Sequence, residues 1–218
     1  MAKVISTNIG ELVTIVHRGK KIETGIYKYP VDHPIFLGQT DVLRDQVIDR
    51  KYHGGVDKAC YLYPAENYPY WAKKFPNLKL DWGMFGENLT IEGLLEADSR
   101  IGATYQIGEA VVQVSQPRQP CFKLGIRFGD QRMVKLFSNA PYPGIYVRVL
   151  HEGLVKSGDS ISLIYDHPES LNLTEVYSLL MNRNKDFKMF QKALNDPFLA
   201  RSAKRDLEKI LKNEERAF

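Results

Sequence analysis

Short runs of β-branched and aromatic residues, separated by turns that contain glycine or aspartate, fill most of the first 165 residues of this 218-residue chain. Residues of these types are typical of β-strands. Long amphipathic helices do not alternate with the runs, which argues against a doubly wound nucleotide-binding fold. The expected strands cover residues 4–9, 12–16, 59–63, 111–114, 145–150 and 160–164.

Two hairpin turns and one helix are expected within this β-rich part. Gly153 and the pair Gly158-Asp159 have the residue types that tight turns favour. After Pro64, the aromatic residues Tyr68, Trp71 and Phe75 recur at near-helical spacing.

The hydrophobic pattern changes after about residue 168. Leu173, Val176, Tyr177, Leu180 and Met181 fall on one face of a helix, and Asn172 with Glu175 resembles a capping box. A second helix is expected from Asp186, and a third from Asp196-Pro197, as N-cap and first helical residue. The sequence therefore predicts a mainly β fold with some α: a barrel-like domain over residues 1–168 and a three-helix extension over residues 169–218.

Several functional classes lose support. No apolar stretch approaches the ~20 residues that span a bilayer, and the N-terminus lacks the apolar block of a signal peptide. The net charge of +4 comes without a long Lys/Arg run, so neither a nucleic-acid partner nor a membrane is expected. P-loop, GxSxG and HExxH motifs are absent. We expect a cytoplasmic protein with reduced cysteines.

The segment that carries most chemical information is V114-S-Q-P-R-Q-P-C-F-K-L124. A strand is expected to end at Ser115, after which two prolines stiffen a loop that can hold the Cys121 sulfur in a fixed direction. Arg118 and Lys123 flank this cysteine, and nearby positive charge favours the thiolate, which attacks electrophiles or binds soft metals. Read locally, Cys121 is either a reactive or ligating thiol or a small apolar residue in a turn.

Three other segments hold polar residues with open interpretations. His53-Gly54-Gly55 can be an anion-binding turn with a proton-transferring histidine or an ordinary surface turn. Glu87 and Asn88 can orient a polar ligand or form a turn into a strand. Asp45 and Asp49 can transfer protons or lie on a solvated face.

Taken together, these segments resemble the MOSC family (molybdenum cofactor sulfurase C-terminal domain), in particular the bacterial YiiM type of 6-N-hydroxylaminopurine resistance proteins. The resemblance runs from Asp45 through HGG-x-DKA at residues 53–59, FGENL at 85–89 and VSQPRQPC-x-KL at 114–124 into the strand YVRVL at 146–150. The helical end resembles the three-helix extension of this subgroup.

The resemblance implies a molybdenum–pyranopterin cofactor with Cys121 as the molybdenum ligand and a catalytic residue. It assigns Gly54, Gly55, Lys58 and Arg118 to the cofactor's phosphate and pterin oxygens. His53 and Asp45 would act as catalytic residues on the substrate side, and Asp57, Glu87 and Asn88 would line or support the site.

The implied reaction is reduction of small N-hydroxylated compounds, such as hydroxylaminopurine-type bases, to amines. Because no flavin or iron–sulfur motif is present, the electrons are expected from a separate reductase, and a homodimer is left open. Two alternatives remain: a sulfur carrier with a persulfide on Cys121, and a non-catalytic cofactor carrier.

The chain departs from the family pattern in the loop before His53. The family often has a G-L-x-G-D-x-Q stretch there, whereas this chain has Arg44 in place of a glycine and Val47 in place of the glutamine. Ala103 also replaces a common aspartate. These differences alter the expected wall of the substrate pocket.

Overall fold

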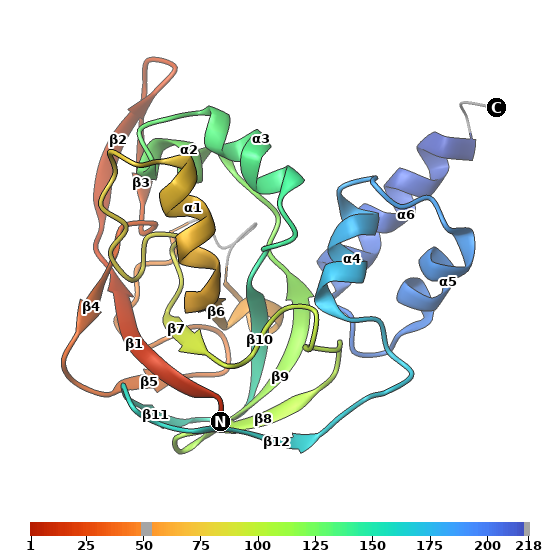
Figure 1. The fold of residues 1–218 in the computed structure, drawn as a ribbon, viewed down its shortest axis with the longest axis horizontal. Helices are drawn as coiled ribbons and strands as arrows, with labels where there is room; N and C mark the ends of the chain where they lie inside the picture. The colour runs from red at the N-terminus through yellow and green to blue at the C-terminus, as the bar shows by residue number, and fades with distance from the viewer. Residues whose placement is uncertain (49–53, 216–218) are drawn as a thin grey trace.

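The computed structural model describes residues 1–48 and 54–215, and an eight-stranded, strongly curled sheet dominates it (Figure 1). All neighbouring strands are antiparallel except β6 and β7. The strand order is β12 (Ile161–Tyr165), β8 (Thr104–Ile107), β9 (Ala110–Pro117), β10 (Ile145–His151), β6 (Cys60–Pro64), β7 (Leu89–Glu92), β1 (Lys3–Gly10) and β4 (Lys28–Val31). Two small two-stranded sheets pair β2 (Val13–His17) with β3 (Lys20–Thr24) and β5 (Ile35–Leu37) with β11 (Gly153–Val155).

The expected sheet-dominated fold with helices is confirmed, but the sheet is not a closed barrel. It curls until the start of β1 meets the start of β12, where Lys3 and Ser160 form an isolated bridge. The Ile161 N–H donates to the Ala2 carbonyl at 2.8 Å. The Val4 N–H donates to the Asp159 carbonyl and the Gly158 N–H to the Val4 carbonyl, both at 2.9 Å, but no regular ladder joins β1 to β12, so β12 and β4 remain the two edges of the sheet.

Two sequence-based details of the strands are wrong. Gly153 does not form a hairpin turn: it begins β11 and pairs with Leu37 of β5. Any Cβ at this position would lie 2.6 Å from the Glu109 carbonyl carbon, so the close passage of another backbone explains the glycine. Strand β9 continues past Ser115 to Pro117, which pairs with Ile145. Proline is tolerated because β8 no longer flanks β9 at this point.

Within the described residues before 168, five short helices lie around the sheet. They are η1 (Val56–Lys58), η2 (Ala65–Asn67), α1 (Tyr68–Lys74), α2 (Phe122–Arg127) and α3 (Arg132–Asn139), of which η1 and η2 are 3-10 helices. The helix expected after Pro64 is α1, which buries Tyr68 and Trp71. It joins an aromatic cluster in which Trp71 stacks at 5.8 Å on Phe137 of α3.

The C-terminal part forms the expected three helices: α4 (Leu173–Leu180), α5 (Phe187–Asn195) and α6 (Arg201–Glu215). The capping box is confirmed, since the Glu175 N–H donates to Asn172 at 2.9 Å and the Asn172 N–H donates to Glu175 at 2.8 Å. The predicted start of the third helix is wrong. The Asp196 carboxylate accepts from the Phe198 N–H at 2.8 Å and forms a turn, and the helix begins at Arg201, four residues after the predicted first residue Pro197.

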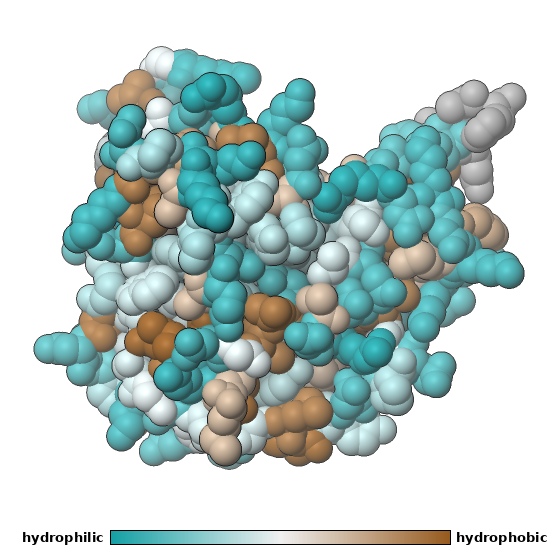
Figure 2. Space-filling view, viewed as in Figure 1, coloured by the Kyte–Doolittle hydropathy of each residue, from teal (hydrophilic) through white to brown (hydrophobic). Residues whose placement is uncertain are grey.

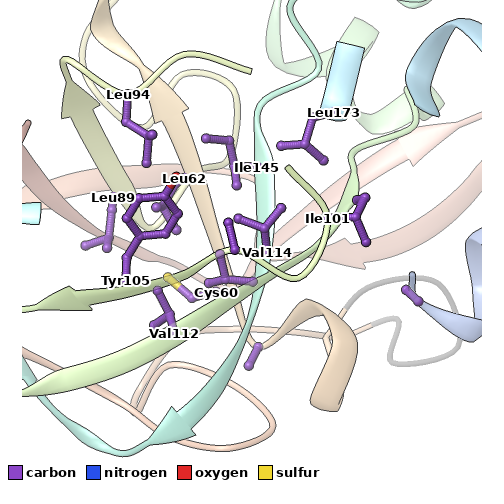
Figure 3. Close-up of a cluster of buried hydrophobic side chains, with 14 of the residues drawn as sticks. Cys60, Leu62, Leu89, Leu94, Ile101, Tyr105, Val112, Val114, Ile145 and Leu173 are labelled. Carbon is purple, nitrogen blue, oxygen red and sulfur yellow. The ribbon is translucent and has the colours of Figure 1, made fainter. Parts of the chain in front are cut away.

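The main hydrophobic core lies between the sheet and these helices. Buried side chains of β9 and β10 and those of α4–α6, including Val176, Phe190 and Leu207, belong to one continuous cluster. Figure 3 shows part of it, with Cys60 of β6 among Leu62, Val112 and Val114. The division at residue 168 therefore stays a prediction about organisation, because the extension shares its core with the sheet.

Hydrophilic residues cover most of the face shown in Figure 2, interrupted by small hydrophobic patches. Within residues 1–48 and 54–215, no helix has both the length and the apolar character needed to cross a bilayer.

Candidate cofactor site

A pocket open to solvent, with about 600 Å³ not filled by protein atoms, lies where several loops meet beside the sheet. Segments distant in sequence meet here: the loop after β3, the loop that carries Asp45, the turn before η1, and the loop between β9 and α2. Its wall contains Cys121, Arg118, Lys58, Lys28, Asp45, Asn88, Tyr61, Tyr146, Lys123, Gly54 and Gly86, with Thr24, Gly25, Ile26, Gln46, Val47, Ile48 and Ala59.

Cys121 lies at the junction of a stiff loop and a helix. It has an extended backbone at the N-cap of α2, its carbonyl accepts from the Leu124 N–H at 3.0 Å, and its side chain is half-buried. Its thiol is accessible from the pocket, whereas Cys60 is buried in the core and its thiol pKa is raised by burial. Of the two thiols, Cys121 alone is placed to react or bind a metal at this pocket.

Arg118 lines the same pocket, and its guanidinium includes one buried donor without a partner in the described part of the chain. The residue is 4% exposed, one Nη1 proton goes to the Phe85 carbonyl, and the guanidinium lies 4.9 Å from the Tyr61 ring. Its Nε is buried and has no hydrogen-bond partner among the residues described. A buried guanidinium at the pocket wall is a fixed positive charge, so it favours an anionic group in the pocket.

Two lysines add positive charge beside Arg118. Burial lowers the pKa of Lys58, while the carboxylates of Asp206 and Asp57 raise it part of the way back. Its Nζ lies 6.0 Å from the centroid of the Tyr146 ring. Lys123 is 6% exposed and lines the same wall. The pocket is thus suited to an anion.

Asp45, an acidic residue of the pocket wall, accepts hydrogen bonds from three donors. Its Oδ1 accepts from the Gly10 N–H at 2.7 Å, and its Oδ2 accepts from Asn88 at 3.0 Å and from the Lys28 ammonium. The Lys28 and Asp45 side chains are only 7% and 2% exposed. Asp45 therefore holds a buried ammonium at the pocket wall rather than lying on a solvated face.

The structure brings six of the sequence-predicted residues to the pocket: Cys121, Asp45, Gly54, Lys58, Asn88 and Arg118. Gly55, Asp57 and Glu87 are not part of its wall. The Gly55 N–H is engaged by the Thr40 carbonyl at 2.9 Å. His53, predicted as catalytic, and Asp49 lie outside the described residues, so their roles stay predictions.

Glu87 stabilises a turn behind the pocket wall. It is fully buried and accepts from the N–H groups of Gly83 at 2.8 Å and Phe85 at 3.0 Å, and from the hydroxyls of Tyr68 and Thr90. Burial raises the pKa of its carboxyl although these donors oppose the shift. Glu87 thereby fixes the Phe85–Asn88 turn that places Asn88 in the pocket.

Sequence reasoning missed Lys28, Tyr61 and Tyr146 as pocket residues. They lie within strands or at a strand start, where alternating patterns suggest packing rather than ligand contact. Burial raises the pKa of Tyr146, which keeps its phenol protonated. The pairing of β10 with β6, which the sequence does not reveal, places Tyr146 opposite Tyr61, and Lys28 comes from β4 at the edge of the sheet.

The loop that departs from the family pattern has a visible consequence. Arg44 adopts φ 68°, in the left-handed region where glycine is favoured, so the family's glycine at this position has a conformational reason. Val47 lies against Gly54, where an added Cβ would be 2.8 Å from the valine Cγ1. The Val47 side chain therefore leaves no room for a side chain at Gly54.

The donor set fits the cofactor that the family implies. No group of three or more His, Cys, Asp or Glu side chains forms a metal site in the described part of the chain. A pterin dithiolene brings most of the ligands of its metal, and Cys121 is the soft side chain at this pocket that could add one more. The unsatisfied Nε of Arg118 and the adjacent lysines fit the anionic part of such a group.

Comparisons with known proteins identify the family of the chain. The MOSC domain matches residues 49–162. YflK of Bacillus subtilis (strain 168), an uncharacterized protein, is 39% identical over 91% of this chain and 90% of its own. A reductase of Gibberella moniliformis (strain M3125 / FGSC 7600) is 34% identical over 82% of this chain, which spans 32% of that protein.

The crystal structure of YiiM from Geobacillus stearothermophilus has a TM-score of 0.80 to this structure. It is 30% identical in sequence, and the match covers 96% of this chain and 98% of that one. The chain belongs to the MOSC domain family, and within it to the YiiM type.

Proposed function

We propose that this protein binds the molybdenum cofactor and reduces small N-hydroxylated compounds, such as hydroxylaminopurine-type bases, to amines. The observation that carries the proposal is a half-buried thiol, Cys121, in one pocket with the buried, unsatisfied Nε of Arg118. A soft metal ligand and an anion-binding donor are the two features that a molybdenum–pyranopterin group requires. The reductase among the relatives supports a redox function, although this chain spans only a third of it.

Four residues would hold the cofactor. Cys121 supplies the protein's thiolate to the metal, and Arg118, Lys58 and Lys123 supply positive charge to the phosphate. When bound, the cofactor supplies two-electron redox chemistry at molybdenum.

The overall reaction is R–NHOH + 2 e⁻ + 2 H⁺ → R–NH₂ + H₂O, and the chain's contribution to it is binding and proton supply. Lys28, held by Asp45, lies at the pocket wall where its ammonium can donate to the N-hydroxyl oxygen. Asn88 donates to the same carboxylate, so Asp45 acts by fixing the position of Lys28. His53 remains a second proposed proton donor.

The electrons require a partner. Because the chain carries no flavin or iron–sulfur motif, we propose a separate electron-donating reductase. Neither a nucleic acid nor a membrane has a role in this proposal, which places the protein in the cytoplasm and leaves a homodimer open.

The first experiment is elemental analysis for molybdenum. The wild-type protein and the Cys121→Ala and Cys60→Ala variants are purified from a cofactor-competent host and from the same host unable to make the cofactor. We expect near-stoichiometric molybdenum in wild type and Cys60→Ala from the competent host alone, and loss of the metal in Cys121→Ala. The buried Cys60 is a matched control for removing a thiol.

Metal-free wild-type protein from both hosts would refute the proposal. In that case a 32-Da adduct on Cys121, detected by mass spectrometry of protein purified without reductant, would favour the sulfur carrier. Stoichiometric molybdenum without turnover of hydroxylamino substrates, given an electron donor of low potential, would favour the cofactor carrier.

A further inference from the structure

Two of the segments that line the pocket also contact the C-terminal extension. The first is the turn of residues 54–58, and the second is the loop of residues 117–121 that ends at Cys121. Both meet α6 or the residues that lead into it, and α6 lies with α4 and α5 along the β9 side of the sheet (Figure 1). The extension thus reaches the candidate site by two routes.

The first route runs through Asp57. Its Oδ1 accepts from Arg148 Nε at 2.6 Å, and its Oδ2 accepts from the Arg201 N–H at 3.2 Å, in the first turn of α6. Arg148 also donates through Nη2 to the Phe198 carbonyl at 2.6 Å. The Asp57 carboxylate, which the resemblance places in or behind the site, therefore accepts from the first turn of a helix of the extension.

The second route runs to the cysteine loop. Ser202 donates to Gln116 Oε1 at 2.7 Å, and Gln119 Nε2 donates to Asp206 Oδ2 at 3.0 Å. Gln119 is two residues from Cys121. Ser202 and Asp206 are four positions apart on α6, so one face of this helix holds the residue before the loop and the middle residue of the loop.

The loop has few free torsions left between these anchors. Pro117 and Pro120 fix their own φ angles and restrict the residues before them, Gln116 and Gln119. Arg118 is fixed by its contact with the Phe85 carbonyl. The side-chain contact between Gln119 and Asp206 therefore controls much of the remaining freedom of the Cys121 backbone.

We propose that Asp206 is a positioning residue of the site, which orients Cys121 through Gln119, so that α6 forms part of the site's framework. The purpose of this orientation rests on the proposed function. The orientation itself is measurable in metal-free protein, so the two proposals can fail separately.

The test is the rate at which iodoacetamide alkylates Cys121 in reduced, metal-free, full-length protein, followed by mass spectrometry. Cys60 is 1% exposed and serves as an internal reference that stays unmodified while the protein is folded. Asp206→Ala and Gln119→Ala each remove the contact, whereas Asp206→Asn keeps an oxygen acceptor for Gln119. Lys209→Ala removes the 3.2 Å ion pair of Lys209 with Asp206 and leaves the Gln119 contact in place.

We expect alkylation to be faster by about threefold to tenfold in Asp206→Ala and in Gln119→Ala, the range that loss of one hydrogen bond allows. Asp206→Asn and Lys209→Ala should match wild type. The double variant Gln119→Ala with Asp206→Ala should react no faster than either single one, because both remove the same contact.

Equal rates in all proteins would overturn the proposal, as would independent, multiplying effects in the double variant. A change in Asp206→Asn equal to that in Asp206→Ala would also overturn it, because it would assign the effect to the charge near Lys58. If the expected pattern holds but wild type never binds molybdenum, the positioning role stands and the proposed function fails. If wild type binds molybdenum but the rates agree, the positioning role alone fails.

Discussion

Replacing Asp45 by asparagine should strongly destabilise the fold, because it leaves the Lys28 ammonium buried without its counter-charge. The two side chains are 2% and 7% exposed, and the carboxylate accepts from three donors. Removing one partner of a buried pair costs about 3–5 kcal/mol. We expect Asp45→Asn to lower the free energy of unfolding by this amount, measured by urea denaturation with far-UV circular dichroism at pH 7.

The double variant Lys28→Met with Asp45→Asn separates the charge effect from the loss of packing. Since no charge remains buried, it should be more stable than Asp45→Asn by about 2 kcal/mol. Lys3→Met is the exposed control: Lys3 and Glu92 pair at 3.1 Å with half-exposed side chains, and breaking this pair should cost less than about 1 kcal/mol. A loss below about 1 kcal/mol in Asp45→Asn, or a double variant no more stable than Asp45→Asn, would refute the reasoning.

Two further predictions concern Glu87 and Arg44. Burial raises the pKa of Glu87 in the folded protein. At pH values between the ordinary carboxyl pKa and this raised pKa, the folded state keeps a proton that the unfolded state has released. The free energy of unfolding therefore falls as the pH rises through this range. Glu87→Gln should remove that slope from the pH dependence of unfolding, whereas Glu92→Gln, at the surface, should keep it; parallel curves for Glu87→Gln and wild type would contradict this. Arg44 adopts φ 68°, so Arg44→Gly should be more stable than Arg44→Ala by about 1 kcal/mol in urea denaturation, because alanine retains the backbone strain; equal stabilities would contradict it.

Local signals in the sequence account for the elements that were predicted well. The β-branched runs form β1, β9 and β10 because the residue types within each run already favour an extended, half-buried backbone. The Asn172 capping box marked the start of α4 because both of its hydrogen bonds are local. The proximity of Arg118 and Cys121 follows from their three-residue separation.

Features that depend on distant contacts could not be predicted. The start of α6 at Arg201 is set by Asp57, which lies 144 residues earlier in the chain. Lys28 belongs to the site because of Asp45 and the sheet order, which no local pattern encodes. Whether the sheet closes depends on the contact of residues 2–4 with residues 158–161, which forms one isolated bridge and no regular ladder.

The shared core of sheet and extension has a consequence for synthesis. Leu207 and Ala203 of α6 are fully buried in the same cluster as Val112 and Val147 of the sheet. While a ribosome is still making the extension, the flank of β9 and β10 has no cover, and its apolar side chains are open to chaperones and to neighbouring chains. The core can be completed only after Leu207 has left the ribosomal exit tunnel. A product truncated before Leu207 would keep this apolar surface exposed and would be a target for degradation.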